Sequence, residues 1–194
     1  MKKYIALSLA IPSLGIILIG LFLYFHDKST PVSTEKVLMP SASSTTSMLL
    51  TSPSFKNNEP IPNKFTCDGG DINPQLMIDN IPPEAKSLAL IVDDSDAPSG
   101  TFTHWTVWNI NPETQFIKEE SSPHGSIEGE TSFNKIGYGG PCPPAGKPHQ
   151  YRFTLYALDS MLSLADGARR GDLEKEIKKH VIAEAELVGV YQRR

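Results

Sequence analysis

Carboxylates, imidazoles and a phenol stand at the ends of three strand-like segments of this sequence. Asp94 and Asp96 follow an apolar run, His104 opens the next such segment, and His149 and Tyr151 open a third. These groups suit three kinds of site, which are an anion pocket, a divalent metal site and a site of acid–base catalysis. The sequence contains no HxH or HExxH pattern of metal ligands and no GxSxG motif around a nucleophile. Metal binding and nucleophilic catalysis are therefore the weaker interpretations.

The acidic turn, residues 93–98, carries three carboxylates and closes with Pro98. If its backbone stays extended, Asp94 and Asp96 lie on one face. The alternative, which these residues alone favour, is an Asx-type turn in which the carboxylates accept hydrogen bonds from nearby backbone N–H groups. A single histidine such as His104 is likewise more often structural than functional. The residues leave open whether this turn is structural or one side of a site.

The segment 137–147 is dense in glycine and proline, and a predicted strand follows it at His149. Because proline removes backbone donors and glycine loses backbone entropy, this segment is not expected to be helical. His149 and Tyr151 are two residues apart and project from the same face of a strand. A stiff loop in front of these side chains predicts one wall of a pocket.

Strand patterns dominate the elements that must position these residues. The nearly continuous apolar run 87–93 predicts a central strand buried on both faces. The other predicted strands are 103–110 and 151–158, with weaker ones at 48–54, 76–80, 116–119 and 187–192.

One helix is predicted near the C-terminus. Asp172 is a suitable N-cap, and Leu173, Ile177, Val181 and Glu184 follow it at helical spacing. A short helical turn near 160–165 is a further option. Many short strands followed by a late helix predict a mainly-β sandwich or pair of sheets.

The N-terminus predicts a membrane anchor. Two lysines precede the uncharged apolar run 4–25, which is about the length that a membrane-spanning helix needs. Charge bias places the lysines in the cytoplasm, so we predict an anchor at 1–25 in the inner membrane with the domain in the periplasm. Cleavage as a signal peptide, leaving a secreted or periplasmic protein, is the alternative. Residues 26–47, rich in Ser, Thr and Pro, predict a flexible tether, and the folded domain is expected at 48–194.

Composition narrows the class of partner. The chain has 194 residues, is 39% hydrophobic and carries a formal net charge of −4, which fits one globular domain with a sizeable core. It shows no basic stripe outside the mixed helix near 175–179. Nucleic-acid binding is therefore disfavoured.

The sequence has two cysteines, Cys67 and Cys142. In an oxidising compartment two cysteines in a domain of this size often pair. A disulfide between them would attach the glycine- and proline-rich loop to the segment 65–69. The alternative is a pair of semi-buried thiols.

Several motifs run in order along residues 50–192: Phe65-Thr66-Cys67-Asp68-Gly69, Asp94-Ser95-Asp96-Ala97-Pro98, His104-Trp105, Gly137-Tyr138-x-Gly140-Pro141-Cys142-Pro143-Pro144, His149-x-Tyr151 and Leu155-Tyr156-Ala157-Leu158-Asp159. Together they resemble the phosphatidylethanolamine-binding protein family, and more narrowly its bacterial Raf-kinase-inhibitor-like branch. Two positions depart from the family pattern: Ser95 stands where a proline is usual, and Gln150 where an arginine is usual.

The resemblance implies a β-sandwich of two sheets, with a C-terminal helix beside a pocket for phosphate, phosphorylated head groups or small carboxylates. The pocket residues that it implies are Asp94, Asp96, Pro98 as a cis-proline, His104, Gly140, Pro141, His149 and Tyr151. The acids are expected to orient the two imidazoles or to raise their affinity for a proton, so that the histidines face the ligand as donors.

We therefore predict a small-anion-binding module with a regulatory role, with no cofactor, no metal and no catalytic residue. Its expected partners are a small anionic ligand and, through the anchor, the membrane; no protein target can be named. One alternative is an inhibitor of a protease or kinase acting through protein contact. Another is a weak phosphoester hydrolase that uses His104 and His149.

Overall fold

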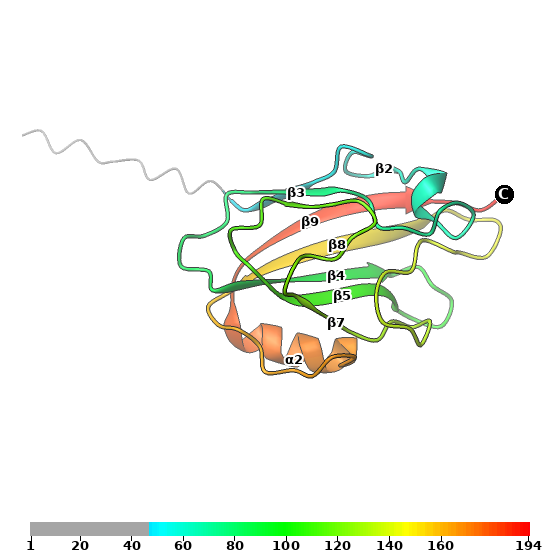
Figure 1. The fold of residues 1–194 in the computed structure, drawn as a ribbon. Helices are drawn as coiled ribbons and strands as arrows, with labels where there is room; N and C mark the ends of the chain where they lie inside the picture. Colours follow the sequence, from blue (N-terminus) through cyan, green and yellow to red (C-terminus); the bar gives the residue numbers. More distant parts are fainter. Residues whose placement is uncertain (1–46) are drawn as a thin grey trace, which may run out of the picture. The chain divides into compact units, whose positions relative to one another are not determined.

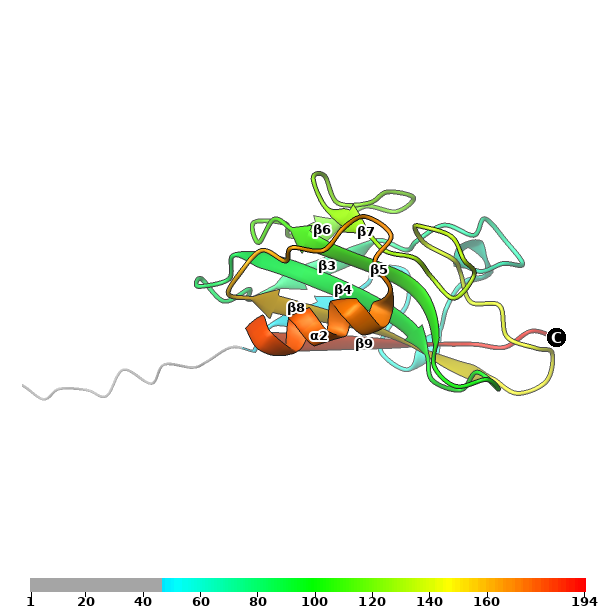
Figure 2. The same ribbon diagram turned by 90° about the horizontal axis from the view of Figure 1, so that it is seen from below.

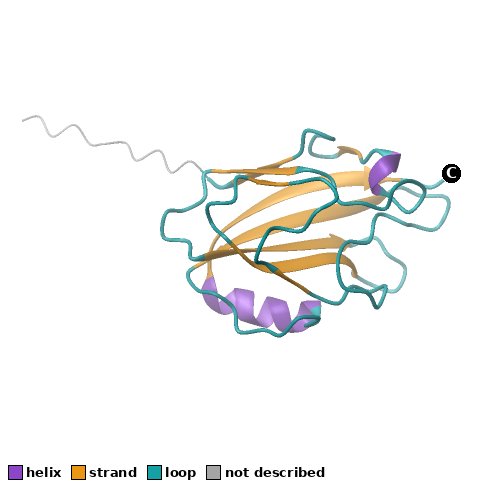
Figure 3. Ribbon diagram, in the orientation of Figure 1, coloured by secondary structure: helices purple, strands orange, loops and turns teal. Residues whose placement is uncertain are grey.

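The computed structural model of the protein describes residues 47–194, which form two stacked β-sheets with one α-helix on the outside (Figures 1 and 3). The strands are β1 (Leu49–Thr51), β2 (Glu59–Pro60), β3 (Leu76–Asp79), β4 (Ser87–Asp94), β5 (Phe102–Ile110), β6 (Phe116–Ile117), β7 (Ile127–Glu128), β8 (His149–Leu158) and β9 (Val181–Tyr191). The helices are the 3-10 turn η1 (Asn63–Phe65) and α2 (Arg170–His180). The predicted two-sheet, mainly-β architecture with a late helix is therefore correct for this part of the chain.

Strand β4 is the centre of the larger sheet, whose order is β2-β9-β8-β4-β5-β7. All eight of its residues are buried, as the apolar run predicted. Leu88, Leu90 and Val92 face the smaller sheet, β1-β3-β6. Ala89 and Ile91 point to the other face and pack with residues of helix α2, which lies across the larger sheet in Figure 2. Since both faces of β4 are covered, its central residues are apolar on both sides and do not alternate with polar ones.

Helix α2 packs Leu173 and Ile177 against the outer face of the larger sheet. It begins after Arg169 rather than at Asp172, and it ends at His180, so the prediction that it continued beyond that point is wrong. The next eleven residues form β9, which pairs antiparallel with all ten residues of β8. Pairing with a long neighbouring strand outweighs the local helical spacing here, as is common for strand sequences. The optional turn at 160–165 is not helical.

The fold-class prediction needs a correction at the N-terminus. Within residues 47–194 no helix is long and apolar enough to cross a membrane. The α-helix there has 11 residues, against about 20 for a membrane span. The predicted anchor at 1–25 lies outside the described residues, as does the tether apart from its last residue. The fold described for residues 47–194 is therefore a mainly-β domain in which no helix could span a membrane. The inner-membrane and periplasmic localisation, which was inferred from the length and hydropathy of one segment, is withdrawn.

Candidate functional site

The candidate site is a pocket of about 270 Å³ at one end of the central strands β4, β5 and β8. This end of the three strands is on the right in Figure 1. Antiparallel pairing places Asp94, the last residue of β4, opposite both Phe102 of β5 and Tyr151 of β8. One strand exit and two strand starts therefore meet at this edge. The pocket is lined by Asp94, Ala97, Pro98, Ser99, Phe102, His104, Phe133, Cys142, Pro143, Pro144 and His149.

Asp94 is bonded through both of its carboxylate oxygens. Oδ1 accepts a hydrogen bond of 2.8 Å from the backbone N–H of Asp96. Oδ2 lies 2.7 Å from Nδ1 of His149, and both of these side chains are buried. The Asx-type turn and the pocket role considered for this residue are thus compatible. The remaining ring nitrogen of His149, Nε2, is the one available to a ligand.

His104 is held through a backbone carbonyl instead. Its Nδ1 lies 2.7 Å from the carbonyl oxygen of Gly139, and only 3% of the residue is exposed. Burial lowers the pKa of His104, and the Gly139 carbonyl and the Asp94 charge oppose this only in part. The acids were expected either to orient the imidazoles or to raise their proton affinity. For His104 the Asp94 charge does act to raise the pKa, but the expected net rise is wrong because desolvation of the charged ring outweighs this attraction.

Aromatic rings surround His104. The ring of Phe102 lies 5.2 Å and that of Phe133 5.3 Å from it, centroid to centroid. The ring of Tyr151 meets it edge to face at 5.1 Å. Burial, reinforced by the Asp94 carboxylate, raises the pKa of Tyr151 above its ordinary range, so the phenol keeps its proton. The pocket thus combines one ionisable pair, Asp94 and His149, with a largely aromatic and proline-lined wall.

The glycine- and proline-rich loop is fastened to the segment after η1. A disulfide joins Cys67 to Cys142 with a Cα–Cα distance of 5.4 Å. The N–H of Gly140 donates to Oδ1 of Asp71 at 2.6 Å. A Cβ on Gly140 would lie 2.5 Å from the carbonyl oxygen of Phe65, so only glycine fits there without displacement. These contacts hold one rim of the pocket in place.

Four of the eight residues predicted for the pocket line it: Asp94, Pro98, His104 and His149. The other four lie around it: Asp96, Gly140, Pro141 and Tyr151. Asp96 accepts a hydrogen bond of 2.8 Å from the N–H of Gln150 and so ties the acidic turn to the start of β8. Pro141 accepts one of 3.1 Å from the N–H of Cys67. Both support the site rather than face it.

Two features implied by the resemblance differ from the structure. No peptide bond among residues 47–194 is cis, so the bond before Pro98 is trans. No residue of α2 lines the pocket, because the helix covers the outer face of the sheet instead.

Sequence reasoning missed the two phenylalanines of the wall. Phe102 stands two residues before His104 and therefore shares its face of β5, which was a usable signal. Phe133 lies in a loop between β7 and β8, and nothing in its neighbourhood marked it. Its position depends on tertiary contacts alone.

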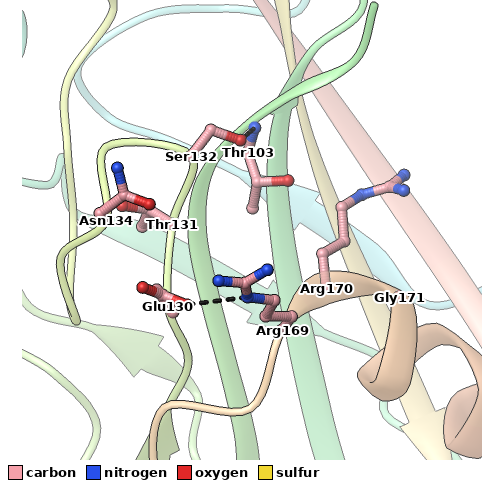
Figure 4. Close-up of a pocket in the computed structure, with 8 residues that line it drawn as sticks. All are labelled: Thr103, Glu130, Thr131, Ser132, Asn134, Arg169, Arg170 and Gly171. Carbon is pink, nitrogen blue, oxygen red and sulfur yellow. Dashed lines mark hydrogen bonds and ion pairs between the residues drawn. The ribbon is translucent and has the colours of Figure 1, made fainter.

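A second hollow, of about 230 Å³, lies at the start of α2 (Figure 4). It contains two arginines, each already paired with a carboxylate. Arg169 lies 2.9 Å from Glu130, and Arg170 lies 2.8 Å from Asp93. Both arginines of this hollow are thus engaged in ion pairs with carboxylates of the same protein.

Comparison with known proteins agrees with the fold. A protein of Pyrococcus horikoshii named as a UPF0098 protein is 51% identical over 147 residues, which cover 72% of this chain and 74% of that protein. A UPF0098 protein of Methanothermobacter thermautotrophicus is 45% identical, over 75% of this chain and 99% of that protein. Neither name includes an enzymatic activity.

Two solved structures resemble this one over 76% of the chain and 99% of their own. The first, described as a homologue of phosphatidylethanolamine-binding protein from Chlamydia trachomatis, is 39% identical with a TM-score of 0.73. The second, YbcL of Escherichia coli, described as a member of the mammalian family of that name, is 30% identical with a TM-score of 0.72. The family model for phosphatidylethanolamine-binding protein matches residues 51–192. With its two-sheet fold and its pocket at the ends of β4, β5 and β8, this chain belongs to the phosphatidylethanolamine-binding protein family.

Proposed function

We propose that the pocket binds a small molecule through an anionic group, either a phosphate, a phosphorylated head group or a carboxylate, and that this binding serves a regulatory role. Membership of the family supports ligand binding or regulation in general terms. The anionic chemistry rests on the side chains that line the pocket.

The buried pair of His149 and Asp94 is the observation that carries the proposal. Both oxygens of Asp94 already accept hydrogen bonds, so the charge of this carboxylate is partly compensated within the protein. A proton on Nε2 of His149 is balanced by the carboxylate, which lies 2.7 Å from Nδ1 of the same ring. That Nε2–H then donates a charge-assisted hydrogen bond to an anionic oxygen.

Size and polarity restrict the ligand further. A pocket of about 270 Å³ is smaller than most sites for drug-sized molecules, which occupy roughly 300–1,000 Å³. It suits a head group rather than a whole lipid. No lysine or arginine is among the residues that line it. A singly charged head with a compact apolar part against Phe102 and Phe133 therefore fits better than a highly charged ligand.

Isothermal titration calorimetry with phosphate, phosphorylethanolamine and acetate tests the proposal. His149→Asn keeps a side-chain donor near the position of Nδ1 for Asp94 but removes Nε2. We expect this variant to bind at least about tenfold more weakly, as for the loss of a hydrogen bond to a charged group.

The matched control is His180→Asn. His180 also pairs with an aspartate, Asp159, at 2.8 Å, but at the opposite end of β8. Its affinity for each probe should equal that of the wild type. Unchanged binding in a folded His149→Asn variant would refute the assignment of this pocket, and absence of binding by the wild type would refute anion binding.

A further inference from the structure

Resting on the proposed function, we infer that the pocket selects an anion that carries its own acidic proton, as hydrogen phosphate or a phosphomonoester monoanion does, and that Nε2 of His104 accepts this proton in a hydrogen bond. The inference narrows the ligand class beyond small anions in general. It concerns a side chain that the proposed function does not otherwise use.

The tautomer of His104 follows from its partner. Nδ1 lies 2.7 Å from the carbonyl oxygen of Gly139, which can only accept a hydrogen bond, so Nδ1 carries the hydrogen. In a neutral ring Nε2 then holds a lone pair and acts as an acceptor. Since His104 lines the pocket, a ligand next to this nitrogen must supply the donor.

The surroundings of His104 keep the ring neutral. The ionisable groups that face it are Asp94 from β4, His149 and Tyr151 from β8, and Asp71 from the loop after η1. The two carboxylates favour a proton on the ring, but desolvation has the larger effect and lowers the pKa. Phe102 and Phe133 complete this apolar environment. A fully deprotonated ligand oxygen next to Nε2 would therefore be repelled, because both atoms would present lone pairs and neither would supply a hydrogen.

The two histidines are thus complementary in what they offer. His149, paired with Asp94, can donate from Nε2 to P–O⁻, while His104 accepts from P–O–H. A phosphomonoester monoanion presents both groups on one phosphorus atom. Sulfate, a carboxylate and a phosphodiester present only acceptors near neutral pH, so each of them lacks one of the two hydrogen bonds.

Calorimetry on the wild-type protein with phosphate and sulfate at pH 6 to 8 tests the inference. The two ions have a similar shape, but only phosphate retains a proton in this range. At pH 6 we expect phosphate to bind on the order of tenfold more tightly than sulfate, the worth of one hydrogen bond to a charged group.

A second series separates titration of the ligand from titration of the protein. Phosphorylethanolamine and methylphosphonate lose their second proton at different pH values, near 6 for a phosphomonoester. If the ligand's proton contributes this hydrogen bond, affinity falls by about tenfold in total as the pH rises through each ligand's own pKa, so the two profiles are displaced. If only the histidines of the protein titrate, the two profiles coincide.

His104→Asn supplies a matched variant, because it retains a donor for the Gly139 carbonyl and removes the acceptor at Nε2. The preference for phosphate over sulfate should then fall to within about twofold, while His180→Asn preserves it. Equal wild-type binding of phosphate and sulfate, or coincident pH profiles, would overturn this inference and leave the proposed function intact. Absence of binding by every anion would overturn both, and the wild-type ligand series decides the matter even if His104→Asn does not fold.

Discussion

Removal of the disulfide between Cys67 and Cys142 should destabilise the domain by an amount that the chain topology sets. The bond closes a loop of 75 residues. In the chain-entropy model a loop of this length restricts the unfolded chain by roughly 4.5 kcal/mol at 25 °C. The double variant Cys67→Ser/Cys142→Ser should lose about that much free energy of unfolding, and its Tm should fall by on the order of 10–15 °C for a domain of this size.

The pocket should change far less than the stability. The same rim is held by the bond from the Cys67 N–H to Pro141 and by the bond from Gly140 to Asp71, neither of which needs the disulfide. Phosphate affinity at 25 °C, where the variant is still folded, should therefore stay within about threefold of the wild type. Most of the effect lies in the unfolded state, so the urea m-value should rise as the unlinked chain exposes more surface.

Urea titration followed by tryptophan fluorescence, together with a count of free thiols in the denatured wild type, measures both quantities. A fully oxidised wild type whose double variant loses less than about 1 kcal/mol would refute the entropic reasoning. A double variant that kept its stability but lost phosphate affinity would also refute this reasoning, because the disulfide would then act on the shape of the pocket instead of on the unfolded chain.

Two further predictions concern single residues. Gly140→Ala should lower the free energy of unfolding by about 1–3 kcal/mol, because the new Cβ would lie 2.5 Å from the Phe65 carbonyl oxygen. Gly171→Ala in α2, whose Cβ would meet nothing within 4 Å, should instead raise it by up to about 1 kcal/mol. Urea titration measures both variants, and a Gly140→Ala variant as stable as the wild type would contradict the close approach. Burial lowers the pKa of His104 in the folded state, so the unfolded chain binds the proton more tightly. The free energy of unfolding should therefore fall as the pH drops below about 6.5, by at most about 1.4 kcal/mol per pH unit relative to His104→Asn. A difference in unfolding free energy between the wild type and this variant that stays constant from pH 5 to 8 would contradict this sign.

The sequence was most informative where one local pattern had one structural solution. Residues 88–92 of β4 form a continuous apolar run between polar residues, and a run this short favours a strand covered on both sides. The region around Val181 had two solutions, since its apolar residues fit both a helix and a strand. Pairing with β8 selected the strand, and that contact cannot be seen in a local window.

The candidate site was predictable in its motifs and not in its electrostatics. Asp94 and the two histidines stand at the ends of strand-like segments, and the family resemblance added Pro98 to the predicted pocket. The charge state of His104 depends on how deeply the fold buries the ring, and Phe133, which helps to bury it, comes from a loop far along the chain. Desolvation is a property of the packed structure, so residue types alone predicted the wrong direction for this pKa.

Consecutive carboxylates at the end of β4 connect the outer face of the sheet to the pocket. Asp93 faces α2 and lies 2.8 Å from Arg170, whereas Asp94 faces the pocket and His149. A slip of β4 by one residue would exchange the two faces and place Asp94 toward the helix. Burial raises the pKa of Asp93, and Arg170 offsets this only in part. The apolar residues on the two faces of β4 set the register that presents Asp94 to the site, and the ion pair between Asp93 and Arg170 is compatible with it.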